Sequence, residues 1–289
     1  MIKSMHKKIG IIGCQSKHAE FFGSLFNVKN EINGYRVEYI LADDEPDRLP
    51  YVLEKAQITH DCEDLEELID QSDIVLITYR FGERHYKPAM ACIEAGKPVF
   101  IDKPFTITED EALDIVEASR KHNVVAQGGS TLCFDPQINL LADLSKRSSF
   151  GSIAYRANIN SPFDGYRFYG SHLTDLCAAI FGDDAVSVRS YRYEENINHL
   201  VCYPSSTVVL QSTPDFKLPQ VILNPEHLMK TYFLSDARCY YFGMKAFIDA
   251  IESKDIDSQK MNHLVFSTRL LAAIMESLST GDEIQLAND

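Results

Sequence analysis

Hydrophobic and polar positions follow two kinds of pattern over the first 125 residues. Short apolar runs rich in β-branched residues predict buried strands, at 7–13, 35–44, 73–79, 98–103 and 123–129. Between them, apolar residues recur at helical spacing and predict helices, at 17–27, 48–56, 64–71, 86–96 and 108–122. Apolar strands that alternate with helices are typical of a parallel sheet covered on both faces. We therefore expect an α/β domain with a doubly wound parallel sheet over residues 1–126.

The pattern changes after about residue 126. Strand-like runs now follow one another with few helices between them, and Arg, Tyr and Ser alternate with apolar residues along them. These runs lie at 151–159, 185–194, 199–204, 206–212, 219–224 and 229–235. Such alternation predicts antiparallel strands with one exposed face. With two closing helices, at about 239–252 and 258–279, residues 127–289 are expected to form an α+β domain with an open, mainly antiparallel sheet.

Composition narrows the classes of partner. The chain of 289 residues carries 28 Lys and Arg against 42 Asp and Glu, a net charge of −14 without a basic cluster, which argues against nucleic acid and anionic membranes. The apolar runs are too short to span a bilayer, and the N-terminal "MIKSMHKK" does not lead into a signal peptide. Seven scattered cysteines without a C-x-x-C pair predict reduced thiols in a cytoplasmic protein and no metal site.

The turn after the first strand is where a doubly wound sheet binds a dinucleotide. There the pyrophosphate lies on free N–H groups at a helix N-terminus. This chain reads "GIIGCQSKHAEFFG", so Gly13 is present but Gln15 and His18 stand where the G-x-G-x-x-G fingerprint has its other glycines. Two interpretations stay open: a shortened loop in which Gln15 or Ser16 donates hydrogen bonds to the phosphates, or a turn that binds nothing.

An acidic residue at the end of the second strand would bind the ribose hydroxyls of a dinucleotide. Asp43 or Asp44 in "ILADDEP" fits this position, although the preceding loop makes the separation longer than usual. A carboxylate there favours NAD over NADP because it repels a 2′-phosphate. The alternative is an acidic turn without a ligand.

The segment 73–129 resembles the Gfo/Idh/MocA family, which includes glucose–fructose oxidoreductase and inositol dehydrogenase. The resemblance continues through "CFDP", "FGSI" and "GSHLTDL" to the closing helices, so that it covers essentially the whole chain. The family's motifs correspond here to Thr78-Tyr79-Arg80, His85, "AGKPV" and Asp102-Lys103-Pro104.

The resemblance implies a nicotinamide cofactor, NAD or NADP, with Lys103 at the nicotinamide and the substrate. It also implies that His172 belongs to a D-x-x-x-H pair, but the acid of that pair falls on Phe168 in this chain. His172 therefore lacks the family's carboxylate partner unless Asp164 or Asp175 replaces it. His172 remains either a proton-transfer group or a helix-start residue without chemistry.

The chemistry of alcohol oxidation explains why these residue types matter. A hydride moves to the nicotinamide while a base takes the hydroxyl proton. A histidine suits the base role at neutral pH, and an ammonium beside it stabilises the developing alkoxide. Lys103 and His172 are therefore the predicted catalytic residues. The predicted cofactor contacts are Gly13, Cys14, Gln15, Ser16, Asp43, Thr78, Tyr79, Arg80, His85, Asp102 and Lys103.

Several of these residues carry a second interpretation. Arg80 either binds a phosphate or carboxylate of a ligand or pairs with Asp102, and His85 either touches the cofactor or starts a helix. Tyr166 and Tyr169 flank His172 as substrate contacts or alternative proton carriers. Asp175 either faces the substrate or caps a turn.

We thus expect an NAD(P)-dependent oxidoreductase acting on a small sugar, polyol or related carbonyl or alcohol, with NAD favoured. One alternative is an inactive relative that binds a nucleotide or small ligand for regulation or assembly, since the glycines and the acid at 168 are lost. Another is an imine or enone reductase on the same fold. An open sheet with one bare face predicts a homodimer or homotetramer.

Overall fold

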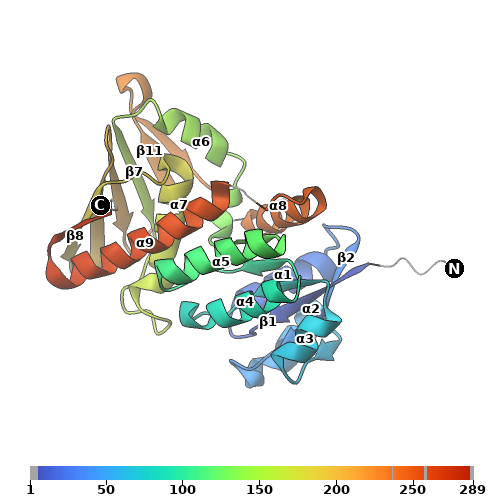
Figure 1. Ribbon diagram of the computed structural model, residues 1–289. Coiled ribbons are helices and arrows are strands. Elements are labelled where there is room, and N and C mark those ends of the chain that lie inside the picture. The colour runs from blue at the N-terminus through green and yellow to red at the C-terminus, as the bar shows by residue number, and fades with distance from the viewer. Residues whose placement is uncertain (1–5, 236, 257–258, 287–289) are drawn as a thin grey trace.

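The computed structural model describes residues 6–235, 237–256 and 259–286. The first five residues of the chain and residue 258, the predicted start of the last helix, lie outside the described residues. The described chain forms two sheets with helices packed around them (Figure 1). Among the described residues, no helix combines the length and the hydrophobicity that a membrane span requires.

The first sheet is parallel and has the strand order β3-β2-β1-β4-β5-β6, so the predicted doubly wound sheet is confirmed. The order reverses between β1 and β4, and this switch point is where such sheets bind ligands. The two-residue strand β3 is the one element of the sheet that the pattern does not predict. The strands are β1 (Lys7–Ile12), β2 (Tyr35–Leu41), β3 (His60–Asp61), β4 (Ile74–Ile77), β5 (Val99–Ile101) and β6 (Ala126–Gly128).

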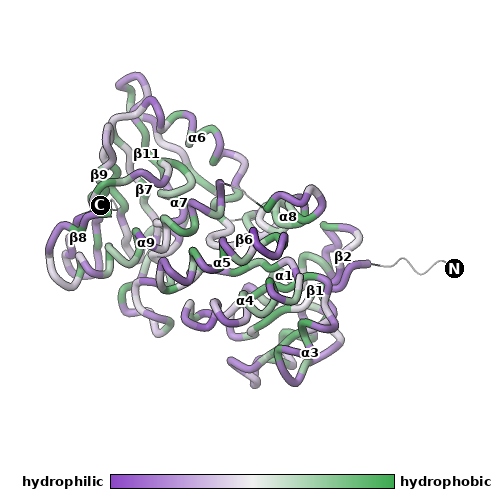
Figure 2. Tube along the Cα trace, viewed as in Figure 1, coloured by the Kyte–Doolittle hydropathy of each residue, from purple (hydrophilic) through white to green (hydrophobic). Residues whose placement is uncertain are grey.

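Helices cover both faces of this sheet, because its strands are apolar on both sides. Figure 2 shows the hydrophobic strands inside and the polar helix faces outside. One face packs against α1, α2 and α8, and the other against α3, α4, α5 and the first turns of α9. The helices are α1 (Lys17–Asn27), α2 (Leu49–Ala56), α3 (Leu65–Gln71), α4 (Tyr86–Glu94), α5 (Glu109–His122), α6 (Ile138–Ser145), α7 (Tyr166–Phe181), α8 (Cys239–Ser253) and α9 (Gln259–Thr280).

The second sheet has the order β12-β11-β7-β10-β9-β8-β13. Only β7 and β10 pair in parallel, so the predicted mainly antiparallel sheet is also confirmed. One face packs on α6, α7 and α9. The strands are β7 (Phe150–Tyr155), β8 (Ser187–Tyr193), β9 (Asn196–Cys202), β10 (Thr207–Ser212), β11 (Gln220–Leu223), β12 (Lys230–Phe233) and β13 (Glu283–Gln285).

The closing helices return to the first sheet, which the predicted division at residues 126 and 127 does not anticipate. Met244, Phe247 and Ile248 of α8 are buried in the same core as Phe22 and Phe100. The start of α9 packs on the parallel sheet and its later turns on the second sheet. We propose the loop after β6 as the division between the domains, with α8 serving as part of the first domain's core.

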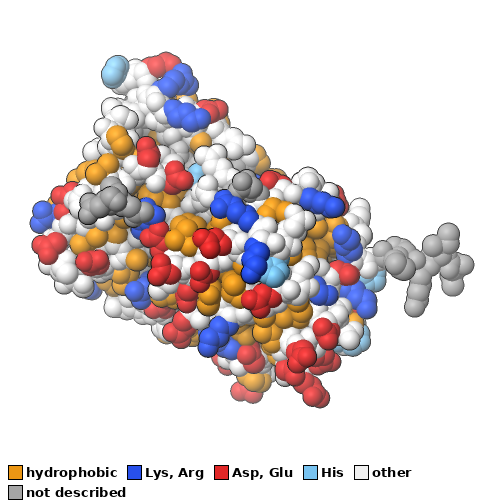
Figure 3. All heavy atoms as spheres, in the orientation of Figure 1, with side chains coloured by type: hydrophobic (Ala, Val, Ile, Leu, Met, Phe, Trp, Pro, Cys, Tyr) orange, Lys and Arg blue, Asp and Glu red, His pale blue; other side chains and the backbone are white. Residues whose placement is uncertain are grey.

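The surface matches the acidic composition. Figure 3 shows acidic and basic side chains mixed over the visible face, with acidic side chains gathered around α3. The first turn of this helix carries Glu66 and Glu67. Nothing on this face resembles the basic stripe that a nucleic-acid partner needs.

The packing of α8 predicts a large loss of stability on truncating its buried aromatic. Phe247 is fully buried, with its ring centroid 5.6 Å from that of Phe100. Phe247→Ala should lower the free energy of unfolding by about 3–5 kcal/mol, measured by urea unfolding with circular dichroism. Phe233→Ala, at a ring that is 56% exposed, is the matched control and should change it by about 0.5 kcal/mol at most. Equal losses in the two variants would contradict the assignment of α8 to the core.

Candidate active site

The turn between β1 and α1 holds Gly13 in a backbone conformation that favours glycine, with φ of +91°. A Cβ at this position would lie 2.8 Å from Cδ1 of Tyr79 and 3.2 Å from Oδ2 of Asp44, so the turn is closely covered. Ser16 is the N-cap of α1, where its Oγ accepts the backbone N–H of His18. Helix α1 therefore begins at Lys17, four residues after Gly13.

The backbone amides of this turn already hold an anion, the carboxylate of Asp44. The N–H of Cys14 donates to Oδ1 of Asp44 at 2.7 Å, and the N–H of Gln15 donates to Oδ2 at 3.1 Å. The Cys14 thiol is buried and bonded to the carbonyl of Glu45, and its pKa is raised to about 12, mainly by burial. Cys14 thus offers a ligand its amide and not its thiolate.

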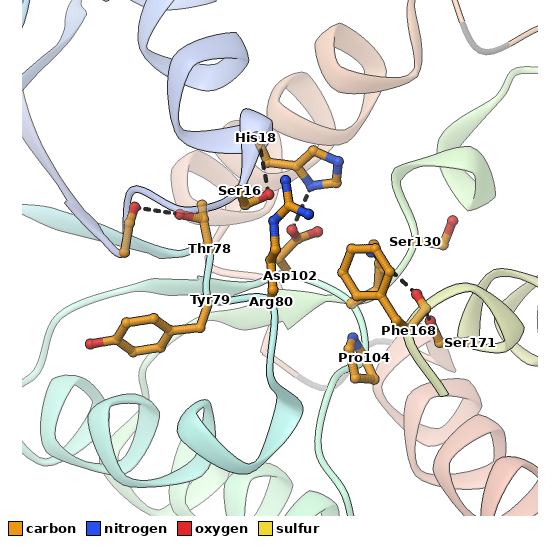
Figure 4. Close-up of polar contacts among 12 residues, drawn as sticks. Ser16, His18, Thr78, Tyr79, Arg80, Asp102, Pro104, Ser130, Phe168 and Ser171 are labelled. Atoms are coloured by element: carbon orange, nitrogen blue, oxygen red, sulfur yellow. Dashed lines mark hydrogen bonds and ion pairs between the residues drawn. The ribbon is translucent and has the colours of Figure 1, made fainter. Parts of the chain in front are cut away.

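The residues after β4 point in different directions. Thr78 is buried and donates its hydroxyl to the carbonyl of Gly13 at 2.8 Å, so it braces the turn. Tyr79 donates to Asp43 at 2.6 Å, and Arg84 pairs with the same carboxylate. Arg80 extends away from Tyr79, toward Ser16 and His18 (Figure 4).

His85 lies fully buried between two backbone carbonyls. Its ring nitrogens are 2.7 Å from the oxygen of Pro104 and 3.0 Å from that of Tyr79. Burial lowers the pKa of His85, although the hydrogen bonds to the carbonyls act in the opposite direction. It joins the loop after β4 to the loop after β5, just before α4. The structure gives it no place in the lining of either cavity described below.

Lys103 lies at the carboxyl end of β5 and is 3% exposed. Its Nζ donates to the carbonyl of Phe168 at 3.2 Å and lies 3.3 Å from the centroid of the Phe168 ring. No carboxylate of the described chain lies within ion-pairing distance of it. Burial lowers the pKa of Lys103 to about 8, although Asp102 acts in the opposite direction. The aromatic ring thus covers the ammonium at the position where the resemblance places a carboxylate.

His172, in the second turn of α7, shares a hydrogen bond of 2.7 Å between its Nδ1 and Oγ of Ser130. Burial, and then the nearby Lys103 cation, lower the pKa of His172 well below 6.5, so the ring is neutral. The acids considered as substitute partners are engaged elsewhere. Asp164 pairs with Arg167, while Asp175 accepts from the Ser130 amide and the Ser267 hydroxyl.

A carboxylate–imidazole pair exists at a place that the sequence pattern does not predict. His18 Nδ1 lies 2.5 Å from Oδ2 of Asp102, although 84 residues separate the two in the chain. Asp102 is buried, and its Oδ1 has no hydrogen-bond partner in the described part of the molecule. The predicted alternative in which Arg80 pairs with Asp102 is therefore not found among the described residues, because Asp102 binds His18 instead. The position of His18 at the start of α1 was the available signal, because that helix faces the carboxyl end of β5.

Two cavities flank the Gly13 turn. The larger, of about 630 Å³, brings together both predicted catalytic residues with Arg80 and Tyr169, and adds His18, Tyr155 and Arg156. The smaller, of about 590 Å³, lies beyond the end of β2 and is lined by Asp43, Tyr79, Arg84 and Lys87, among others. We call them the catalytic cavity and the β2 cavity.

Two predicted substrate contacts lie outside the catalytic cavity. Tyr166 is buried in the second domain's core, where its hydroxyl is 2.7 Å from Nε2 of His199. Asp175 lines a separate cavity of about 410 Å³ behind Ser130, and burial raises its pKa to about 6. Both face inward on α7 because their neighbours in the core fix them, and Tyr169 alone of the three reaches the catalytic cavity.

Solved structures share this fold over nearly the whole chain. Scyllo-inositol dehydrogenase of Lactobacillus casei superposes with a TM-score of 0.82 over 99% of this chain and 100% of its own, at 15% identity. Its form with bound NAD(H) and scyllo-inositol gives 0.79, at 16% identity and 98% and 100% coverage. At such identity the likeness establishes the fold alone.

Sequence comparison gives curated relatives and a matching family model. Inositol 2-dehydrogenase 2 of Saccharopolyspora erythraea is 31% identical over 46% of this chain and 38% of its own length. Scyllo-inositol 2-dehydrogenase (NADP(+)) of Bacillus subtilis is 30% identical over 41% of this chain and 31% of its own. The matches thus span less than half of these curated relatives. Residues 7–130, less than half of the chain, match the model of the Gfo/Idh/MocA oxidoreductase family, which has an NAD-binding Rossmann fold.

Proposed function

We propose that the protein is an NAD(P)-dependent oxidoreductase that transfers a hydride between the nicotinamide and a carbon of a small sugar, polyol or related alcohol or carbonyl. One observation carries the proposal: Lys103 from the end of β5 and His172 from α7 line one cavity beside the Gly13 turn. The match to the family model and the names of the inositol dehydrogenases support the same activity. These relatives give no support to an inactive alternative.

The residues present fit a dinucleotide. The amides of Cys14 and Gln15 both donate to one carboxylate, and this orientation supports their binding an anion. The two cavities lie on either side of these amides, with acidic Asp43 beside the one and Lys103 in the other. An adenosine in the β2 cavity and a nicotinamide in the catalytic cavity would leave the pyrophosphate at the turn.

Lys103 and His172 suit two complementary roles at the substrate hydroxyl, charge stabilisation and proton acceptance. When bound, the cofactor supplies the hydride chemistry. The Lys103 ammonium stabilises negative charge on the substrate oxygen. A neutral His172 whose Nδ1–H donates to Ser130 keeps Nε2 free to accept the hydroxyl proton. Ser130 in turn accepts the amide of Leu132, so the imidazole is oriented by a hydroxyl and not by a carboxylate.

Polar side chains in the catalytic cavity suit a hydroxylated substrate. Arg156 and Tyr169 offer hydrogen-bond donors on the side of the second domain. The inositol substrates named for the relatives have the matching chemistry, a ring of hydroxyl groups. We therefore place this chain's substrate among the polyols and sugars.

Charges in the β2 cavity favour NAD over NADP. Its lining carries four carboxylates and two cations, so its net charge is −2. One of the cations, Arg84, is already paired with Asp43 at 2.7 Å. An added 2′-phosphate would enter a negative field without a free arginine.

We propose further that the protein works in the cytoplasm as a homodimer or homotetramer. All seven cysteines are free thiols, as expected for a reducing compartment. The outward side chains of the second sheet include partly exposed Leu200, Val209 and Ile222 in one row across neighbouring strands. A second copy covering this row would bury it.

The proposed function predicts NADH binding and polyol oxidation. Calorimetric titration should give a Kd for NADH about tenfold or more below that for NADPH, the size expected for one close repulsion. With a panel of inositols and hexoses, His172→Asn should lower kcat by about 10²-fold or more. The exposed His122 provides the matched control, and His122→Asn should leave kcat unchanged. Absence of binding by either cofactor at millimolar concentration would contradict the proposal.

The environment of Lys103 predicts an unusual titration. Its ammonium should persist below pH 8 and be lost above it, because burial sets its pKa at about 8 against 10.5 for an ordinary lysine. Competitive acetylation at a series of pH values, read by peptide mass spectrometry, should show this, with the exposed Lys146 as internal reference. Phe168→Asp should move the midpoint upward, because a carboxylate stabilises the ammonium. A midpoint near 10.5 in the wild type would contradict the burial described.

The oligomer prediction is tested by the mass in solution. Light scattering after gel filtration should give two or four times the chain mass of 32.7 kDa. Leu200→Glu, at one end of the partly exposed row, should shift the mass toward one chain without changing the circular dichroism spectrum. A wild-type mass of one chain would overturn the prediction.

A further inference from the structure

The amides that would receive a pyrophosphate are occupied by the chain itself. Asp44 binds the N–H groups of both Cys14 and Gln15 with its two oxygens, 2.7 and 3.1 Å away. One of these oxygens lies 3.2 Å from where a Cβ of Gly13 would stand. The carboxylate therefore covers the only glycine of the turn, at the point where a phosphate approaches a Rossmann backbone most closely.

Two arginines converge on the same turn. Arg48 donates Nη1 to the carbonyl of Gln15 at 2.7 Å, and Arg80 donates Nε to the same carbonyl at 3.2 Å. Two guanidinium groups that share one carbonyl repel each other, and burial together with Arg48 lowers the pKa of Arg80. Such a pair is stabilised when an anion with two negative charges lies between or beside its members.

The two arginines differ in what balances their charge. Arg48 pairs with Glu20 at 3.0 Å. Arg80 has no carboxylate within 4 Å in the described part of the chain; its guanidinium lies instead 4.0 Å from the ring centroid of Phe163. Arg80 is thus held in place, half-buried, without an opposite charge in contact.

We propose that Asp44 stands in for the cofactor's pyrophosphate in the ligand-free protein and that binding displaces it, with Arg48 and Arg80 then holding the phosphates. This inference rests on the proposed function, because it assigns residues to the cofactor of that site. It explains how a turn without the second and third glycines binds a diphosphate: guanidinium groups supply the contacts that close backbone approach supplies elsewhere. It also makes the carboxylate an internal competitor that weakens cofactor affinity.

Asp44 could compete with the cofactor or simply brace the loop, and the two roles predict opposite changes in NADH affinity when its charge is removed. Asp44→Asn removes the negative charge and leaves a single acceptor for the two amides. If Asp44 competes with the cofactor, the variant binds NADH about tenfold tighter, the size expected for removing one close charge. Because the amides then lose their anion, the melting temperature of the ligand-free variant falls. A loop brace would instead lose stability and affinity together.

The experiment uses calorimetric titration of the full chain with NADH and thermal unfolding without ligand. Arg80→Met and Arg48→Met should each weaken NADH binding about tenfold and reduce its dependence on salt, because a charge contact to phosphate is lost. Asp47→Asn is the matched control, since it removes the same charge three residues away at an exposed side chain. Asp44→Ser repeats the test should the Asn variant fail to fold.

Tighter NADH binding and a lower melting temperature in Asp44→Asn, with neither change in Asp47→Asn, would support the proposal. Unchanged or weaker NADH binding in the Asp44 variants would overturn it while leaving the proposed function intact. If neither wild type nor variants bind NADH, the proposed function fails, and titration with inorganic pyrophosphate decides the inference separately. Binding of pyrophosphate by Asp44→Asn more tightly than by the wild type would then support displacement, and equal or absent binding would overturn it.

Discussion

The buried ammonium of Lys103 joins the two domains and sets the charge of the site between them. Its donor bond to the Phe168 carbonyl and its contact with the Phe168 ring connect the end of β5 to the first turn of α7. A lysine buried without a contacting carboxylate gives up hydration that an aromatic face replaces only in part. Burial lowers the pKa of Lys103. Burial of the imidazole, and then the nearby Lys103 cation, lower the pKa of His172.

Loss of the family's acid at position 168 therefore has a definite structural meaning. A carboxylate there would hold Lys103 charged over a wide pH range and orient His172. With Phe168 in its place, the pKa of Lys103 is lowered to about 8, and Ser130 orients the imidazole of His172. A different carboxylate, that of Asp102, pairs with an imidazole, that of His18. The first domain thus supplies an oriented acid–imidazole pair of its own.

The turn after β1 also holds charged groups close together, namely the Asp44 carboxylate and the Arg48 and Arg80 guanidinium groups. Asp44 occupies the amides, and the arginines that border them lack a matching diphosphate. Both the turn and the Lys103 site hold polar groups whose balance changes when an anionic ligand enters. We propose that a bound anion relieves the repulsion between Arg48 and Arg80 beside Gln15.

The sequence predicts the fold well because hydrophobic periodicity determines it locally. The predicted helix at 17–27 coincides with α1, and the T-x-x-E spacing of Thr108 and Glu111 marks the capping box at the start of α5. Elements without such signals are not predicted: β3 consists of two exposed residues, and α6 lacks a side-chain cap.

Within the site, strand ends and helix starts locate Lys103 and His172, since the topology fixes both. The pairing of His18 with Asp102 and the binding of Asp44 to the turn depend on packing between segments about 30 to 84 residues apart, which no local pattern encodes.

A crystal structure of the protein with NADH tests the cofactor assignment directly. Density for the nicotinamide should lie in the catalytic cavity, within contact distance of Lys103 and His172, and density for the adenosine should lie beside Asp43. A cofactor bound elsewhere, or a catalytic cavity from which the nicotinamide is absent while the adenosine is ordered, would contradict it.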